Sequence, residues 1–167
     1  MRRLLVLLAL AFVAGCGDDG GRATATAEPE LGLRYGVIGD SLSNGEGLGA
    51  DAAWPVLLAE RFDLDLVTNP AISGWTTLDA LRAEVPALDA AQPEVATVLI
   101  GANDLAADVP PRVFRSRLRQ LYEQVAEIVG GARDVLAVTI PDFSLKPIGK
   151  TFATSATIAV YNAVIRD

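Results

Sequence analysis

Val-Ala-Thr-Val-Leu-Ile-Gly-Ala-Asn-Asp, residues 95–104, is the most informative stretch of this sequence. Its first six residues form an apolar run that is rich in β-branched side chains and ends at a glycine, a pattern that predicts a buried strand. Asn103 and Asp104, two polar residues that can take part in chemistry, follow the run at once. The stretch therefore predicts a central strand whose carboxyl end carries functional side chains.

Short apolar runs and stretches with helical spacing alternate on both sides of this strand. The expected strands are 34–39, 64–68, 95–100 and 135–140, and the expected helices are 53–62, 76–89, 112–129 and 155–165. Alternation at this spacing implies parallel strands that are joined by crossover helices. We therefore expect an α/β fold of three layers, α/β/α, built around a doubly wound parallel sheet.

Three motifs follow the first three expected strands, at the edge where an open parallel sheet carries its chemistry. They are Gly39-Asp40-Ser41, Asn69–Thr77 with Gly74 inside it, and Gly101-Ala102-Asn103-Asp104. A serine in a tight turn between strand and helix is exposed, and nearby backbone N–H groups can face a bound oxyanion. Gly74 permits close approach of the backbone to a ligand, and Asn103 offers a carboxamide donor.

Taken in order, these motifs resemble the SGNH, or GDSL, family of serine hydrolases, and Trp54-Pro55 with Leu57-Leu58 looks like its thioesterase and lysophospholipase branch. The resemblance implies a flavodoxin-like sheet, a small carboxyl ester or thioester as substrate, and no cofactor. It also implies roles for individual residues. Ser41 would be the nucleophile, and the oxyanion hole would consist of the backbone N–H groups of Ser41 and Gly74 and the side-chain amide of Asn103. The expected supporting residues are Gly39, Asp40, Gly101 and Asp104, the two aspartates through structural hydrogen bonds.

The fourth motif of that family, Asp-x-x-His, has no counterpart here, because the sequence contains no histidine and ends at Asp167 after an expected helix. We therefore expect a domain that is incomplete at its C-terminus, without the final strand and the loop that bears Asp-x-x-His. Loss of a triad histidine typically costs on the order of 10⁶ in turnover. The expected esterase activity of this chain is accordingly little or none.

Two other interpretations stay open on the sequence alone. The chain could be a non-catalytic surface lipoprotein that keeps the pocket to bind an acyl chain or a glycan, or a truncated and unstable product. Nucleotide binding is not indicated, because the glycines at 45, 47 and 49 lack the Gly-x-Gly-x-x-Gly spacing.

The N-terminal 31 residues read as export and tethering segments. Arg2-Arg3, the apolar run Leu4–Val13 and the small residues before Cys16 predict a bacterial lipoprotein signal over residues 1–16, with Cys16 as the lipidated residue. Residues 17–31 are small and polar, which predicts a flexible tether to the domain at 32–167. We expect an exported protein, anchored by lipid to the cell membrane or the outer membrane and facing the periplasm or the exterior.

Charge argues against a nucleic-acid partner. The sequence has 21 acidic residues against 14 Lys and Arg, a formal net charge of −7. Phosphate binding needs clustered basic residues, and the arginines of the expected helix 112–129 stand among acidic neighbours. No group of Cys, His and carboxylates has the spacing of a metal site.

Overall fold

The computed structural model describes residues 32–145 and 149–167. The expected signal segment 1–16, its Cys16 and the tether 17–31 lie outside the described residues. Within the described ranges, no helix combines the length and the apolar character needed to cross a bilayer.

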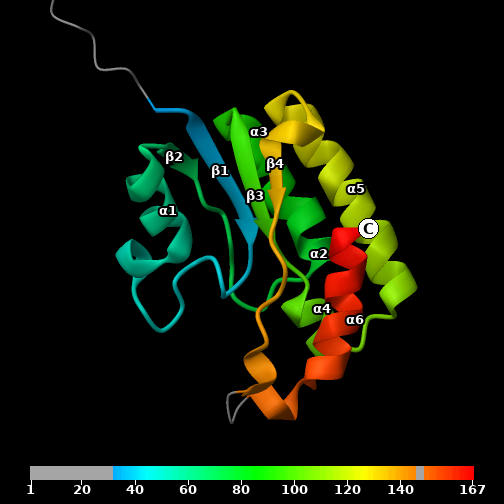
Figure 1. Ribbon diagram of the computed structural model, residues 1–167. Helices are drawn as coiled ribbons and strands as arrows, with labels where there is room; N and C mark the ends of the chain where they lie inside the picture. Colours follow the sequence, from blue (N-terminus) through cyan, green and yellow to red (C-terminus); the bar gives the residue numbers. More distant parts are fainter. Residues whose placement is uncertain (1–31, 146–148) are drawn as a thin grey trace, which may run out of the picture. The chain divides into compact units, whose positions relative to one another are not determined.

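A parallel sheet forms the centre of the fold (Figure 1). In the described part of the chain its strands are β1 (Arg34–Gly39), β2 (Asp65–Thr68), β3 (Val95–Leu99) and β4 (Val135–Ala137), in the order β2-β1-β3-β4. All three strand pairs are parallel. The doubly wound α/β fold expected from the sequence is therefore confirmed.

Helices follow each strand along the chain. They are α1 (Trp54–Phe62), α2 (Thr77–Asp79), α3 (Val85–Ala91), α4 (Ala102–Ala106), α5 (Pro111–Val129) and α6 (Ser155–Arg166). Short 3-10 turns occur at Ala50–Ala52, Ala132–Asp134, Phe143–Leu145 and Gly149–Thr151.

The structure differs from the sequence expectation in two helical regions. The helix expected over 76–89 is interrupted by a π-helical turn, Ala80–Glu84, which separates α2 from α3. The short helix α4, directly after β3, was not expected at all, because five residues carry too little apolar periodicity to be recognised.

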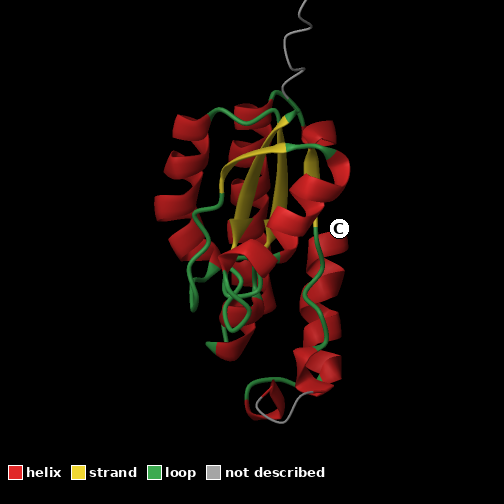
Figure 2. Cartoon of the chain, turned by 90° about the vertical axis from the view of Figure 1, so that its left-hand side faces the viewer, coloured by secondary structure: helices red, strands yellow, loops and turns green. Residues whose placement is uncertain are grey.

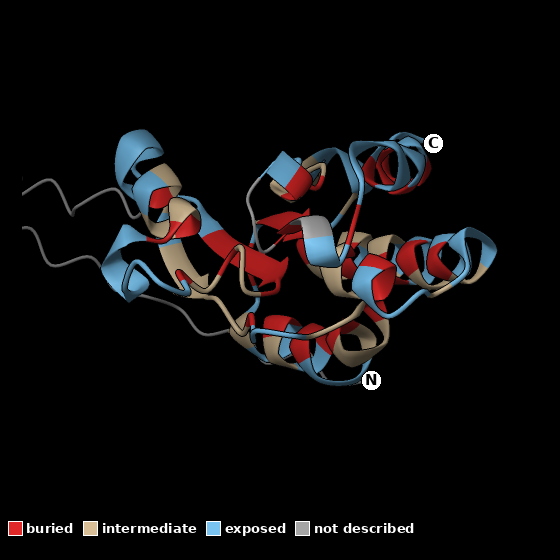
Figure 3. Ribbon diagram, turned by 90° about the horizontal axis from the view of Figure 1, so that it is seen from below, coloured by how far each residue is buried: buried red, intermediate tan, exposed pale blue. Residues whose placement is uncertain are grey.

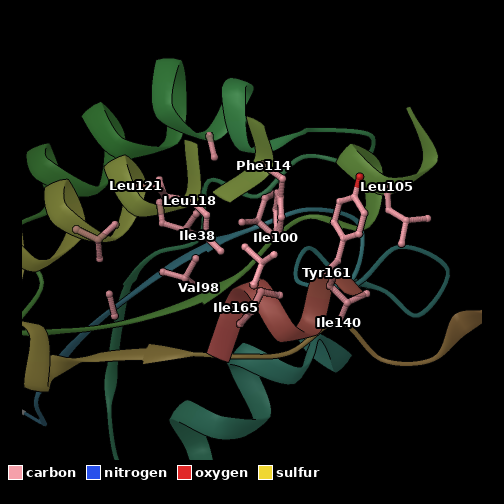
Figure 4. Packing of buried hydrophobic residues seen from close by; sticks show 14 of the residues in the cluster. Ile38, Val98, Ile100, Leu105, Phe114, Leu118, Leu121, Ile140, Tyr161 and Ile165 are labelled. Atoms are coloured by element: carbon pink, nitrogen blue, oxygen red, sulfur yellow. The ribbon is translucent and has the colours of Figure 1, made fainter. Parts of the chain in front are cut away.

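Two apolar clusters hold the layers together, and helices lie on both sides of the sheet (Figure 2). Side chains alternate along a strand, so Tyr35 and Val37 of β1 pack with Ala59 of α1, whereas Ile38 belongs to the other cluster. That larger cluster joins the sheet to α3, α5 and α6 (Figure 4). The side chains labelled in the close-up are Ile38, Val98, Ile100, Leu105, Phe114, Leu118, Leu121, Ile140, Tyr161 and Ile165. Burial is concentrated in the two central strands, β1 and β3, and on the inner sides of the helices (Figure 3).

The expected strand 135–140 is shorter in the structure, and Asn162 of α6 explains where the strand ends. Val138 N–H still reaches the carbonyl of Val98 at 2.9 Å. At Ile140, however, the N–H donates to Asn162 Oδ1 and the carbonyl accepts from Asn162 Nδ2, both at 2.8 Å. One buried side chain thus replaces a strand partner and fixes α6 to the segment after β4.

We predict that Asn162→Ala lowers the free energy of unfolding by about 3 kcal/mol, since two buried backbone groups of Ile140 would lose their partners. Urea denaturation followed by circular dichroism measures the change. The control is Val160→Ala on the same helix, where the side chain is 51% exposed and the expected change is within about 0.5 kcal/mol. Equal effects of the two substitutions would contradict the role of Asn162.

Candidate active site

Ser41 lies in a tight turn that begins where β1 ends. The carbonyl of Asp40 accepts hydrogen bonds from the N–H groups of Ser43 and Asn44, at 2.9 and 3.1 Å. The Asp40 side chain is fully buried, and its Oδ1 accepts from Leu42 N–H at 3.0 Å. Asp40 therefore fixes the backbone on both sides of Ser41, which itself is half-buried.

Asn103 is held at the end of β3 by a glycine that has no room for a side chain. Gly101 has a φ of 123°, and a Cβ placed on it would lie 2.7 Å from the Phe114 ring. This close approach lets α4 begin directly after the strand. Asn103 Nδ2 then donates to the carbonyl of Trp75 at 2.8 Å and lies 3.3 Å from Asp40 Oδ2.

Ser41 and Asn103 line one cavity of about 270 Å³. The rest of its lining is apolar and comes from Leu42, Ala102, Ala106, Phe143 and Phe152. The structure thus brings together two of the three residues expected to act directly. A serine hydroxyl and a carboxamide beside an apolar cavity are suited to a substrate with a polar carbonyl and an apolar substituent.

Gly74 lies in the exposed loop between β2 and α2, with a φ of 84°. It is outside the described lining of the 270 Å³ cavity, and it is connected to the cavity through the next residue, Trp75, whose carbonyl binds Asn103. Side chains also join this loop to the Ser41 turn. Asn69 Nδ2 donates to the carbonyl of Ser43 at 2.9 Å, and Asn44 Nδ2 donates to Ser73 Oγ at 3.0 Å.

Asp104 is fully buried and faces away from the cavity toward the start of α2. It accepts from Thr77 N–H at 2.8 Å and from Thr77 Oγ1 at 2.6 Å, and Arg117 of α5 lies 3.7 Å from it. A buried carboxylate is tolerated when donors and an opposite charge surround it. Asp104 therefore binds the third motif to α2 and α5.

Sequence reasoning missed Glu84, which lies directly beneath the Ser41 turn. Its carboxyl is fully buried, and Oε2 accepts from Gly39 N–H at 2.8 Å. Burial raises the pKa of Glu84 to about 8 and that of Asp40 to about 6. A glutamate in a helical stretch normally faces solvent, so only the π-helical turn reveals that this one points inward.

Sequence reasoning also missed Phe143 and Phe152, because both come from irregular segments after β4. No periodicity marks such residues in advance. Over the described ranges 32–145 and 149–167, no group of three or more His, Cys, Asp or Glu residues could hold a metal ion.

A serine after β1, a glycine loop after β2 and Gly-x-Asn-Asp after β3 of a parallel sheet together define the SGNH class of serine hydrolases. Residues 37–167 match the family described as GDSL-like Lipase/Acylhydrolase. The chain belongs to this family.

Relatives of known name match part of the chain. It is 38% identical over 91 residues to "Thioesterase 1/protease 1/lysophospholipase L1" of Escherichia coli K12. The matched residues make up 53% of this chain and 43% of that protein. It is 32% identical over 96 residues to an arylesterase of Vibrio mimicus, 54% of this chain and 48% of that protein. The matched region thus spans less than half the length of either relative.

The fold also matches solved structures. The lipase/acylhydrolase from Enterococcus faecalis superposes with a TM-score of 0.66 over 80% of this chain and 69% of that one, at 19% identity. At that identity the match concerns the fold alone.

We predict that Thr77→Val lowers the free energy of unfolding by about 2 kcal/mol, because the buried Asp104 carboxylate would lose a hydroxyl donor. The matched control is Thr77→Ser, which keeps the hydroxyl and should cost about 1 kcal/mol for the lost methyl group. Urea denaturation of the three proteins gives the values. A serine variant that is as unstable as the valine variant would show that the hydrogen bond does not matter.

Proposed function

We propose that this chain carries the nucleophile and the oxyanion hole of a hydrolase that cleaves carboxyl esters or thioesters through an acyl-enzyme on Ser41. The observation that supports this best is the cavity that Ser41 shares with Asn103. The names of the relatives, a thioesterase and lysophospholipase and an arylesterase, support the same substrate classes.

In the proposed reaction, Ser41 Oγ attacks the acyl carbon and gives its proton to a base. The carbonyl oxygen becomes an oxyanion, which would be held by the N–H groups of Ser41 and Gly74 and by the Asn103 amide. Each such donor contributes about 3–4 kcal/mol to the transition state. The alcohol or thiol leaves with a proton, and water then releases the acid from Ser41.

The Asn103 amide has to change partners in this reaction. Its Nδ2 donates to Trp75 at 2.8 Å and to Asp40 at the longer distance of 3.3 Å. The longer bond is the weaker one, so its hydrogen is the one that would turn toward the oxyanion.

Removal of the Ser41 proton needs a base, and these 167 residues include no histidine that could serve as one. Asp40 and Asp104 are occupied by Leu42 and Thr77. We therefore propose that this chain by itself acylates Ser41 very slowly, and that a base supplied from outside the chain accelerates the step.

The acyl group would occupy the 270 Å³ cavity, whose lining beside Ser41 and Asn103 is apolar. Phe152 lines this cavity and also a neighbouring one of about 470 Å³ between the α4–α5 loop and α6. Phe152 thus forms part of the wall between them, and we propose that it limits the length of the acyl chain.

We propose further that the domain acts outside the cytoplasm, held to a membrane through a lipid on Cys16. The support is the order of a basic start, a short apolar run, small residues and a cysteine in residues 1–16.

A non-catalytic role, binding of an acyl chain or a glycan, is the second candidate. It is favoured by the absence of histidine from the sequence and by the inward hydrogen bonds of the Asn103 amide. Reactivity of Ser41 separates the two candidates.

We predict that an alkyl fluorophosphonate labels Ser41 slowly, with loss of fluoride and formation of an Oγ–P bond, and that added imidazole speeds the reaction at least tenfold. The physical reason is that a positioned general base contributes about 10² to 10⁴, of which free imidazole recovers a part. Intact-protein mass spectrometry measures the rate.

The Ser41→Ala variant should show no labelling, whereas the control Ser116→Ala, at an exposed serine of α5, should react like the unaltered protein. Labelling that persists in Ser41→Ala, or that ignores imidazole, would favour the binding role.

A second prediction concerns chain length. Phe152→Ala should raise the ratio of labelling rates between an octyl and an ethyl fluorophosphonate by about tenfold, since each newly buried methylene contributes about 0.8 kcal/mol. Phe62→Ala, which removes an exposed phenylalanine from α1, should leave the ratio unchanged. If both variants keep the original ratio, Phe152 does not limit the acyl chain.

A further inference from the structure

Glu84 is a buried carboxyl for which the proposed reaction has no use. It is the last residue of the π-helical turn Ala80–Glu84, and its side chain is 0% exposed. A π-turn accommodates one residue more than an α-helical turn and occurs often at functional sites. Here it places Glu84 under the end of β1, where Gly39 lies.

Glu84 contacts the backbone that leads into the nucleophile. Oε2 accepts from the N–H of Gly39 at 2.8 Å, and Gly39 directly precedes Asp40 and Ser41. The other oxygen, Oε1, is buried and has no hydrogen-bond partner among the described residues. A carboxylate with one unpaired oxygen in such a place is far more costly than a protonated carboxyl.

The charges around Glu84 also favour its neutral form. Asp40, after β1, and Asp79, on α2, act on it, and both are carboxylates. The nearby cations, Arg82 on the same π-helical turn and Arg117 on α5, act on Asp79. Burial, the largest cause, and these carboxylates together outweigh the lowering effect of the Gly39 hydrogen bond and raise the pKa of Glu84 to about 8, above the pKa of about 6 for Asp40. Near neutral pH, Asp40 is therefore ionised and Glu84 carries a proton.

We propose that Glu84, as the neutral acid, is a positioning residue for Ser41. It holds the N–H of Gly39, and with it the Gly39-Asp40-Ser41 turn, without adding a second negative charge behind the oxyanion hole. Ionised Asp40 then keeps its hydrogen bond from Leu42 N–H and, before the oxyanion forms, the one from Asn103. This inference rests on the proposed function of Ser41.

Loss of the Glu84 proton would have two effects on the site. The new charge would oppose the negative charge that develops on the oxyanion, and it would repel Asp40 and so disturb the turn. The reactivity of Ser41 then falls as the pH rises through about 8. A base alone gives no such fall, because imidazole is mostly deprotonated above about pH 7 and its contribution then levels off.

The test is the pH profile of imidazole-assisted fluorophosphonate labelling from pH 6 to pH 9.5. In the unaltered chain the rate should fall about fivefold between pH 8 and pH 9, the drop expected for one essential proton with a pKa near 8. Glu84→Gln keeps an acceptor for Gly39 and cannot ionise, so its rate should stay level over that interval. Glu60→Gln, which removes an exposed carboxylate from α1, should keep the fall. An equal fall in Glu84→Gln overturns the proposal.

A second measurement does not depend on catalysis. The amide signals of Gly39 and Ser41, followed by nuclear magnetic resonance, should shift together with a midpoint near pH 8 in the unaltered chain and stay constant in Glu84→Gln. Constant signals in the unaltered chain would overturn the positioning role. Absence of any Ser41-dependent labelling would instead overturn the proposed function, and the amide titration would still decide the role of Glu84.

The pH dependence of folding stability is a third measure of the protonation of Glu84. Because the pKa of Glu84 is raised on folding from 4.5 to about 8, its stabilising contribution is complete below about pH 4.5 and is lost as the pH rises to about 8. The thermal midpoint of the unaltered chain should therefore decline more steeply over this range than that of Glu84→Gln. Parallel declines of the two midpoints would contradict the proposal.

Discussion

The site depends on one hydrogen-bonded junction, in which the Asn103 amide reaches the Asp40 carboxylate on one side and the Trp75 carbonyl on the other. The three residues follow β3, β1 and β2, and the two contacts span 63 and 28 residues of sequence. Parallel strands end at the same edge of a sheet, so the topology brings these loops together before any side chain is chosen. The two hydrogen bonds of the Asn103 amide then fix the positions of the three loops relative to one another.

Beneath this junction lie carboxyl groups that water does not reach, and the protein accommodates each in its own way. Asp104 is surrounded by donors, the N–H and hydroxyl of Thr77 and the guanidinium of Arg117. Asp40 has Leu42 and Asn103. Glu84 has the N–H of Gly39 alone, and its pKa is raised further than that of Asp40. The fewer the donors, the more the neutral acid is favoured. The raised pKa values of Asp40 and Glu84 therefore make the surroundings of Ser41 sensitive to pH, although most of the cavity lining is apolar.

Much of the fold follows from local sequence patterns, because apolar runs and helical spacing are local and the parallel sheet follows from their alternation. The pairing of Ser41 with Asn103 was also predictable, since each follows a strand. The inward direction of Glu84 was not, because a π-turn rotates the helix by one residue and leaves no mark in the periodicity. Nor was the early end of β4, which depends on Asn162, a residue 22 positions from its partner Ile140. Such contacts belong to tertiary packing, and a single sequence does not encode them in any local pattern.

The long sequence separation of the residues that Asn103 joins has a consequence for the synthesis and folding of the protein. A ribosome releases the segment with Ser41 before the segment with Asn103, and contacts of large sequence separation are slow to form because of their loop-closure entropy. Until β3 has paired with β1, Asn103 is not held beside Ser41, and the cavity that the two residues share is not yet formed. If Ser41 acts as proposed, its reactivity would therefore appear only once β3 has paired with β1.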